Sequence, residues 1–464
     1  MFKIKDIEKR MGASEGTLFF MLSALIIKVI GGIYKIPLYN LLGSDGIGLY
    51  QMVFPVYALL LTLSSGGIPS GITKLISGGE NAQRVLKKCT KLFLPIGLLL
   101  SFFMFFLGDL IALKQGNLLA GSLYKAISPS VFIVCLLGCL RGYFQGKSNF
   151  MPTALSQIIE QVVKAVSGVI ALLFTNGSYV KKAFLACIAV TLSEVMSLAF
   201  MATVYFVKIK KEKLIGVKEE YREKNDESKL TFKRLIVFIL PLTLTSLCIP
   251  FASFIDSFIA VNALKNTFGE KATAVYGVYT GGVESVISLP VSVLHSLSLG
   301  FLPKITGDKN GQKSMLYVFI LSCLAGIFTA LFAPFITKIL FGKNNEYLSL
   351  LTKLVTISSV NVIFHSTLHA SSTYILAMGK QRVSLINLII GIAVKVIIDF
   401  TLIKLPQINI FGMIISDVGC YFVALVLNLI YIYYSKKSSI VGIKYEDNPS
   451  RLRHRAKFPF GKSA

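Results

Sequence analysis

The chain has 464 residues, of which 54% are hydrophobic and 15% are charged, and its mean hydropathy is +0.69. Soluble domains carry about 25% charged residues, so these values exclude a string of soluble domains and indicate a membrane protein. The seven cysteines are scattered without a CxxC spacing, which excludes a secreted disulfide scaffold and indicates small buried side chains. Because the formal net charge is +25, the location of the basic residues matters.

Apolar segments follow one another along the whole chain. Twelve of them approach or exceed the roughly 20 mostly apolar residues that a membrane-spanning helix needs. In chain order they cover residues 15–37, 47–77, 91–112, 122–143, 153–175, 181–206, 234–262, 272–303, 314–341, 348–378, 383–403 and 409–435. The sequence therefore predicts an all-α polytopic membrane protein with about 12 transmembrane helices.

The basic residues predict the orientation of these spans. If the N-terminus is cytoplasmic and basic residues near the span ends are counted with the adjoining loop, 34 Lys and Arg residues fall on the cytoplasmic side and 11 on the outer side, which leaves Lys28, Lys164 and Lys395 deep within spans. Cytoplasmic loops carry the excess of Lys and Arg, so both termini are expected to be cytoplasmic. The basic charge then reflects topology and affinity for anionic membrane lipids. No basic-aromatic module is present, which argues against nucleic acid as a partner.

The loops divide the chain and argue against an enzyme. Every outer loop is short, so no external catalytic domain is expected. The longest polar stretch separates two sets of six spans and is expected to be a solvated linker. The predicted organisation is a cytoplasmic N-terminus (1–14), a first six-helix lobe (15–206), a cytoplasmic linker (207–233), a second six-helix lobe (234–435) and a basic cytoplasmic tail (436–464).

The two halves echo each other in sequence. Gly-Lys at Lys147 and Val-Lys at Lys164 match Gly-Lys at Lys380 and Val-Lys at Lys395, with a gap of two residues. Six is an even number, so both halves enter the membrane from the same side. A six-plus-six duplication therefore predicts two lobes related by a pseudo-twofold axis along the membrane normal, the plan of parallel-repeat transporters.

Span two of the first half and span eight of the second half both contain helix-breaking residues. Each exceeds 30 residues, which is too long for one straight helix across a hydrocarbon core of about 30 Å. The helix-breaking residues are Gly66, Gly67, Pro69 and Gly71 in span two and Gly277, Gly281, Gly282 and Pro290 in span eight. Interrupted helices at corresponding positions favour a substrate cavity between the halves. Ordinary packing of Gly and Pro in membrane helices is the alternative.

Charges inside the spans are candidate site residues, because a charge in hydrocarbon costs at least about 2.5–3.5 kcal/mol and needs a cavity or a partner. Span one carries Lys28, Gly31, Gly32 and Lys35 on one helical stripe, and Tyr34 flanks it. Snorkelling to the membrane surface is an alternative for Lys35, near the outer end, but is difficult for Lys28 at mid-depth. We expect this stripe to line the cavity.

Two further spans carry opposite charges one helical turn apart. Glu160 and Lys164 have this spacing in span five, and Lys395 and Asp399 repeat it in span eleven. A pair at this spacing can form within one helix. Both interpretations stay open for these residues: a structural ion pair that holds helices together, or a polar wall of the cavity.

The remaining candidates are isolated acids and histidines. Glu284 lies at mid-depth in span eight with no basic neighbour in its helix, and Asp256 lies in the outer part of span seven. His365 and His369 share a face of span ten, but no further ligands accompany them, so packing is expected and neither a metal nor a cofactor is predicted. The candidate substrate-binding residues are therefore Lys28, Tyr34, Lys35, Glu160, Lys164, Asp256, Glu284 and Lys395.

Three segments carry a resemblance to a known family. They are GGIYKIPLYNLLGSDGIGLYQMVFPVYALLLTLSSGGIPSGITK, QGKSNFMPTALSQIIEQVVK and, later in the chain, YG…SLPVSVLHSLSLGFLPKIT. From about residue 10 to 435, the chain resembles the stage V sporulation protein B family. This family belongs to the polysaccharide-transporter branch of the multidrug/oligosaccharidyl-lipid/polysaccharide (MOP) exporter superfamily and is related to the lipid II flippases.

The resemblance implies two six-helix lobes around a cavity lined by helices 1, 2, 7 and 8. It implies a flippase that moves undecaprenyl-diphosphate-linked oligosaccharide, such as the peptidoglycan precursor lipid II, from the inner to the outer leaflet of the bacterial cell membrane by alternating access. Cell-wall synthesis proteins are further candidate partners. In the lipid II flippases, basic residues on helix 1 engage the diphosphate; Lys28 falls on one such position, and Tyr34, beside Lys35, falls on the next. Many relatives have fourteen helices, whereas spans are expected here only to about residue 435.

Rival functions make different demands on the sequence. The main alternative, a cation-coupled multidrug exporter of the same superfamily, would typically place a buried carboxylate on helix 1, where this chain has lysine. A membrane glycosyltransferase would need acids on a sizeable outer loop, and a non-transporting scaffold is the third rival. Energy coupling stays open between the membrane potential and an ion bound at Glu160, Glu284 or Asp256.

Overall fold

The computed structural model describes residues 13–214, 232–300, 311–342 and 346–446, and within the first range the side chain of Lys28 lies outside the description. These ranges form helices joined by short turns and contain no strand. In chain order the elements are α2 (Ala13–Leu61), η1 (Thr62–Gly66), α3 (Ile68–Ser77), α4 (Ala82–Lys114), η2 (Leu118–Ala120), α5 (Gly121–Gly146), α6 (Met151–Leu173), α7 (Tyr179–Leu214), α8 (Phe232–Phe268), η3 (Gly269–Lys271), α9 (Ala272–Gly277), η4 (Val278–Val283), α10 (Glu284–Gly300), α12 (Gly311–Phe341), α13 (Leu348–Ala377), α14 (Gln381–Leu402) and α15 (Phe411–Glu446).

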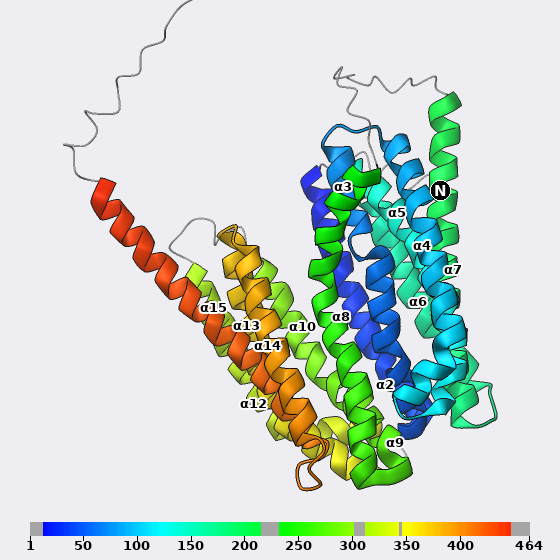
Figure 1. Ribbon diagram of the computed structural model, residues 1–464, viewed down its shortest axis with the longest axis vertical. Coiled ribbons are helices and arrows are strands. Elements are labelled where there is room, and N and C mark those ends of the chain that lie inside the picture. Colours follow the sequence, from blue (N-terminus) through cyan, green and yellow to red (C-terminus); the bar gives the residue numbers. More distant parts are fainter. Residues whose placement is uncertain (1–12, 215–231, 301–310, 343–345, 447–464) are drawn as a thin grey trace, which may run out of the picture.

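The described helices provide twelve candidate membrane crossings, the number that was predicted. Ten helical stretches in the described ranges are long and apolar enough to span a membrane. Two of them, Val29–Ser77 and Ser246–Ser298, hold two crossings each because the chain reverses inside them (Figure 1). The first reversal is at Gly43, whose φ of 69° and ψ of 177° suit glycine. The second reversal is at the short 3-10 helix η3.

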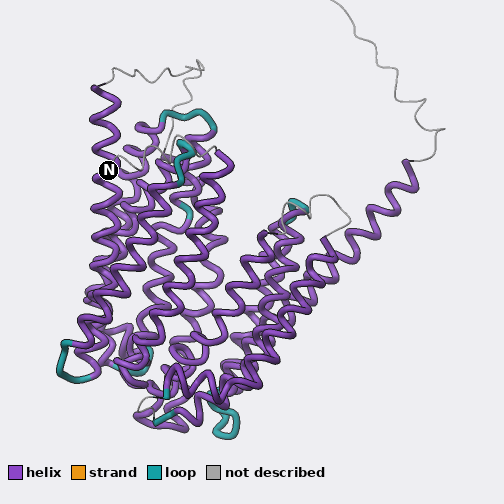
Figure 2. The backbone as a smooth tube through the Cα atoms, turned by 180° about the vertical axis from the view of Figure 1, so that it is seen from behind, coloured by secondary structure: helices purple, strands orange, loops and turns teal. Residues whose placement is uncertain are grey.

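The helices form two lobes arranged as a V (Figures 1 and 2). The first lobe holds α2 to α7, the second holds α9 to α15, and α8 lies between them. The lobes are apart at the end that carries α3 and meet at the end that carries α9. At this closed end a Cβ atom on Gly277 would lie 2.6 Å from the Cα atom of Gly48, and the Asn117 amide donates to Thr273 Oγ1 at 2.9 Å.

Helix α8 packs against both lobes. Near its start, Ile239 fills the space left by a glycine of the second span, because a Cβ atom on Gly71 would lie 2.3 Å from Ile239 Cγ1. Nearer its end, Asp256 forms an ion pair with Lys395 of α14, with an O–N distance of 3.1 Å. The helix therefore joins the two lobes.

The predicted interruptions of spans two and eight are present as π-helical segments. Element η1 separates α2 from α3, and η4 separates α9 from α10. π-helical turns are rare and often occur at functional sites. Their glycines allow close packing: a Cβ atom on Gly281 would lie 2.4 Å from Ile47 Cγ1 of the opposite lobe.

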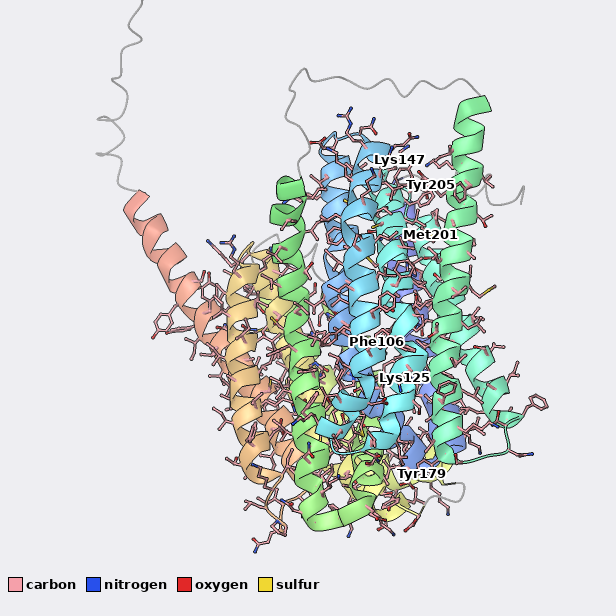
Figure 3. All side chains as sticks on the ribbon, turned by 45° about the vertical axis from the view of Figure 1, so that its right-hand side comes forward. Phe106, Lys125, Lys147, Tyr179, Met201 and Tyr205 are labelled. Atoms are coloured by element: carbon pink, nitrogen blue, oxygen red, sulfur yellow. The ribbon has the colours of Figure 1, made fainter. Side chains whose placement is uncertain are left out.

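The outer surface of the first lobe is apolar at mid-height. Phe106 of α4 projects outward there and is 69% exposed (Figure 3). Lys147 lies toward one end of the lobe, and Lys125 and Tyr179 lie toward the other. An apolar belt between charged and aromatic side chains is the arrangement that a bilayer favours.

Candidate functional site

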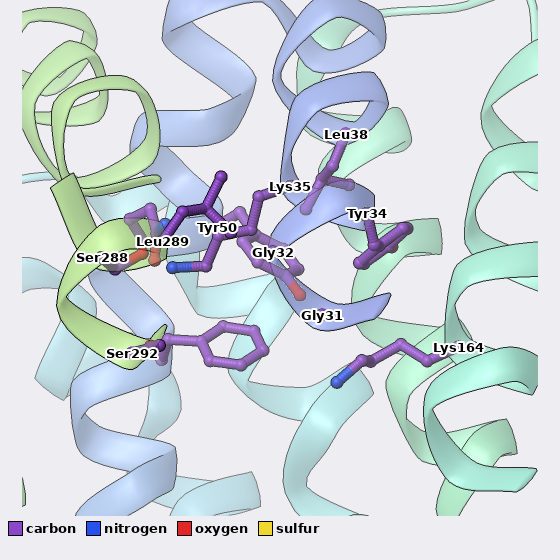
Figure 4. Close-up of a pocket in the computed structure, with 12 residues that line it drawn as sticks. Gly31, Gly32, Tyr34, Lys35, Leu38, Tyr50, Lys164, Ser288, Leu289 and Ser292 are labelled. Atoms are coloured by element: carbon purple, nitrogen blue, oxygen red, sulfur yellow. The ribbon is translucent and has the colours of Figure 1, made fainter. Parts of the chain in front are cut away.

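A cavity of about 290 Å³ lies between the lobes, and we call it the lysine chamber. Its walls come from both arms of α2, from α6 and from α10, and Figure 4 shows Lys164 extending from α6 toward it. The lining residues are Gly31, Gly32, Tyr34, Lys35, Leu38, Tyr50, Gln51, Phe54, Lys164, Ser288, Leu289 and Ser292. Three of the predicted site residues, Tyr34, Lys35 and Lys164, thus meet in one cavity.

Lys35 and Lys164 are the charged residues of this chamber, and both are cations. Within the part of the chain that the structure describes, neither ammonium group forms an ion pair within 4.0 Å. A cation at membrane depth needs a compensating partner. The chamber is therefore suited to an anionic ligand.

The predicted pairing of Glu160 with Lys164 is wrong. Glu160 Oε2 instead accepts a hydrogen bond from Arg141 Nη2 of α5 at 2.9 Å, and Arg141 also donates to Ser156 and Ser197. An arginine fork matches carboxylate geometry better than a lysine point charge does. Glu160 consequently lies outside both chambers, and the Lys164 side chain is left to the lysine chamber.

The stripe on the first arm of α2 is brought partly into the site. Lys28 lies on this arm, but its side chain is outside the described ones, so its predicted role stays a prediction. Gly31 lines the lysine chamber. Gly32 receives a residue of the opposite lobe, because a Cβ atom there would lie 2.5 Å from Leu289 Cδ2. Tyr34 is buried, and its ring lies against Gly168.

A second cavity of about 380 Å³ adjoins the first, and we call it the histidine chamber. The two cavities share Lys35, Ser288 and Ser292. The other residues of the second are Ser253, Tyr279, Val283, Glu284, Ile287, Val291, His295, Ser358, Asn361, His365, His369, Asp417 and Tyr421. Glu284, a predicted site residue, has an exposed side chain here.

Three histidines stack in this chamber. The ring centroids of His295 and His369 are 4.0 Å apart, those of His369 and His365 are 4.7 Å apart, and His365 lies 4.1 Å from the ring of Tyr421. The predicted packing of His365 and His369 is thus observed, but His295 and the cavity wall were missed. No group of three potential metal ligands occurs in the described ranges.

Helix α13 presents a polar stripe to the histidine chamber. Ser358, Asn361, His365 and His369 follow at intervals of three, four and four residues, which places them on one helical face. Sequence reasoning singled out only the two histidines. The signal for the other two was available, since a polar side chain recurred at helical spacing along an otherwise apolar span.

Asp256 and Lys395, both predicted to line the cavity, lie instead in a charged cluster between α8 and the second lobe. Lys395 Nζ lies 2.9 Å from Asp417, 3.1 Å from Asp256 and 3.3 Å from Asp399. The Tyr279 hydroxyl donates to Asp417 at 2.5 Å. A lysine in an apolar lobe gathers carboxylates because its charge must be compensated. Asp417, which also lines the histidine chamber, was missed because its own span shows no polar stripe.

Comparisons with known proteins agree with this architecture. Residues 13–307 match the model of the family described as polysaccharide biosynthesis protein. Stage V sporulation protein B of Bacillus subtilis (strain 168) is 26% identical over 422 residues, which cover 86% of this chain and 79% of that protein. Lipid II flippase MurJ of the same organism is 24% identical over 450 residues, which cover 90% of this chain and 82% of that protein. The predicted family resemblance is confirmed.

Solved structures with the same fold are transporters. The inward-facing conformation of a multidrug resistance MATE family transporter of the MOP superfamily gives a TM-score of 0.68 at 16% identity, covering 90% of this chain and 99% of that one. Lipid II flippase MurJ in an inward closed conformation gives a TM-score of 0.68 at 13% identity, covering 90% and 87%. These likenesses confirm the fold class, an all-helical multi-pass membrane protein with two lobes.

Proposed function

Because the chain belongs to the polysaccharide biosynthesis protein family, we propose that it is a flippase for lipid-linked oligosaccharide. The substrate is an undecaprenyl-diphosphate-linked glycan, such as the peptidoglycan precursor lipid II, and the membrane is the bacterial cell membrane. The relative that is named lipid II flippase MurJ supports this substrate class.

The observation that carries the proposal is that two lysines without a described ion-pair partner share one cavity. Lys35 and Lys164 both line the lysine chamber, and neither forms an ion pair with a described residue. A diphosphate bears several acceptor oxygens and negative charge, and it would satisfy both ammonium groups together. A cationic drug would meet repulsion from both side chains. The chamber chemistry therefore favours the anionic lipid carrier over the multidrug-exporter alternative.

The proposed transport cycle follows from the V shape. We place the open end in the cytoplasm, because a cytoplasmic N-terminus puts 34 Lys and Arg residues on that side against 11 outside. The head group enters the chambers there, and an opposite movement of the lobes releases it outside. With the interior negative, outward movement of an anion is favourable by about 2.3 kcal/mol per charge per 100 mV.

The test is transport by the purified chain in lipid vesicles. A fluorescent undecaprenyl-diphosphate disaccharide is supplied in one leaflet, and its appearance in the other is followed with a membrane-impermeant quencher. Lys35→Gln and Lys164→Gln are each expected to slow transport at least about tenfold, since an ionic hydrogen bond contributes about 1.5–3 kcal/mol. Lys125→Gln is the matched control, because Lys125 pairs with Asp109 on the exposed surface.

Two outcomes would contradict the proposal. The first is a wild-type chain that does not move the labelled lipid. The second is transport by both lysine variants at the wild-type rate. Efflux of a cationic dye that persists in Lys35→Gln and Lys164→Gln would support the multidrug-exporter alternative instead.

A further inference from the structure

We infer that the polar stripe of α13, together with Glu284, binds the glycan part of the substrate, while the lysine chamber holds its diphosphate. This inference rests on the proposed function and divides the cavity into two subsites. It assigns the sugar rings to the histidine chamber. It also assigns a role to Ser358 and Asn361, which the proposed function alone does not use.

Two buried polar groups of α13 that line the histidine chamber lack partners inside the described structure. Ser358 and Asn361 are 1% and 5% exposed, and Ser358 Oγ and Asn361 Oδ1 make no hydrogen bond there. Both residues line the histidine chamber, one helical turn apart. Buried polar groups in folded proteins nearly always have a hydrogen-bond partner. A sugar hydroxyl can both donate and accept, so a single hydroxylated ring can satisfy both groups.

Two carboxylates, Glu284 and Asp417, line the histidine chamber beside the shared Lys35, whereas the charged residues of the lysine chamber are both basic. The Glu284 side chain is exposed to the histidine chamber and forms no ion pair with any described residue. The other carboxylate in the wall, Asp417, is already bonded to Lys395 and Tyr279. A carboxylate repels phosphate but accepts hydrogen bonds from hydroxyls. The chamber therefore favours the uncharged, hydroxylated part of the substrate.

The histidine stack presents ring edges rather than ring faces. His365 lies between Tyr421 and His369, and His369 lies between His365 and His295, so both faces of these two rings are occupied. The edge of a neutral His365 imidazole carries one donor and one acceptor, which matches a hydroxyl group. Stacking also restricts ring rotation, and a wall held in place before binding loses less entropy when it binds.

The chambers are joined in the order that the substrate requires. Lys35, Ser288 and Ser292 line both of them, so one ligand can reach across the boundary. In a lipid-linked glycan the diphosphate is bonded directly to the first sugar. A diphosphate beside Lys35 and Lys164 therefore places that sugar at the entrance of the histidine chamber.

Binding of two matched probes tests the inference with the purified full chain in lipid nanodiscs. One probe is a short polyprenyl diphosphate, and the other is the same diphosphate carrying a disaccharide of N-acetylhexosamines. The wild-type chain is expected to bind the glycosylated probe at least about tenfold more tightly. Asn361→Ala and Ser358→Ala are each expected to remove up to about tenfold of this preference, the effect of one hydrogen bond, without changing affinity for the bare diphosphate.

Ser366→Ala is the matched control. Ser366 lies on the same helix, is fully buried and lacks a partner in the described structure, but it lines neither chamber. It is expected to keep the full preference for the glycosylated probe. An equal loss in Ser366→Ala and Ser358→Ala would indicate a packing effect and overturn the inference.

The remaining outcomes separate this inference from the proposed function. Tight binding of both probes with equal affinity overturns the glycan subsite and leaves the flippase proposal intact. A loss of bare-diphosphate affinity in Asn361→Ala places α13 in the anion site and also overturns the inference. Failure of both probes to bind overturns the proposed function itself, and the subsite with it.

Discussion

The carboxylate of Glu160 lies 2.9 Å from the guanidinium of Arg141, and this contact determines what the neighbouring lysine can do. The two side chains are 16% and 12% exposed, so the pair is well shielded inside the first lobe. Glu160 and Lys164 are one helical turn apart on α6, yet the arginine from α5 takes the carboxylate. Lys164 therefore lines the cavity and does not form an ion pair with Glu160.

We expect the Arg141–Glu160 pair to be structural. Arg141→Met removes the ion-pair partner of the buried Glu160 carboxylate, which should lower the free energy of unfolding by about 3 kcal/mol or more. The double variant Arg141→Met/Glu160→Gln should lose less than the sum of the single changes, because these residues are in contact. Thermal unfolding of the purified protein in detergent measures both effects. Strictly additive losses would show that the pair is not coupled.

Lys164→Met should behave in the opposite way. No ion pair within the described structure depends on Lys164. Its removal should therefore keep the unfolding temperature and the membrane level while it abolishes transport of the lipid-linked glycan. A drop in stability as large as that of Arg141→Met would contradict this prediction and would indicate that Lys164 forms a structural pair with Glu160.

The cluster around Lys395 should be the most sensitive part of the second lobe. Lys395→Met would leave the carboxylates of Asp256, Asp399 and Asp417 together without a described counter-charge. We expect a loss of about 3–5 kcal/mol, the range seen when a buried ion pair is broken. The double change Lys395→Met/Asp256→Asn should be milder, since it removes one charge of each sign. Membrane levels and thermal unfolding test this, and a more severe double variant would contradict it.

Much of the fold could be predicted because each crossing leaves its own signal. Apolar length fixed the number of spans, and the Lys and Arg bias fixed their expected direction. The interruptions of spans two and eight followed from glycine and proline within stretches of more than 30 residues. These signals depend on residues close in the chain, so a single sequence is sufficient to find them.

The site was harder to predict, because pairing between helices depends on distant residues. Spacing along α6 suggested Lys164 as the partner of Glu160, but Glu160 pairs with Arg141 of another helix. Likewise Asp256 and Asp417 reach Lys395 from α8 and α15. Charges within one span can be read from the sequence, but which charge meets which requires the packing.

Gly48 offers a test of the closed end of the V. A Cβ atom at this position would lie 2.1 Å from the carbonyl oxygen of Thr273 in the opposite lobe, a distance that no relaxed side chain accepts. Gly48→Ala should therefore force α2 away from α9 and favour a conformation opened at this end. Spin labels at Lys181 of the first lobe and Glu346 of the second should report a longer distance in the variant than in the wild type.

The matched control for this measurement is Gly138→Ala. A Cβ atom on Gly138 would find its nearest atoms at 3.5 Å, an ordinary contact inside the first lobe. The labels require replacement of Cys248 and Cys323, the cysteines that are partly exposed in the described structure. Because both substitutions add one methyl group to a buried helix, a difference between them reports the contact between the lobes rather than helix propensity. An unchanged distance in Gly48→Ala, with normal transport, would show that the lobes close this end without the approach of Gly48 to Thr273.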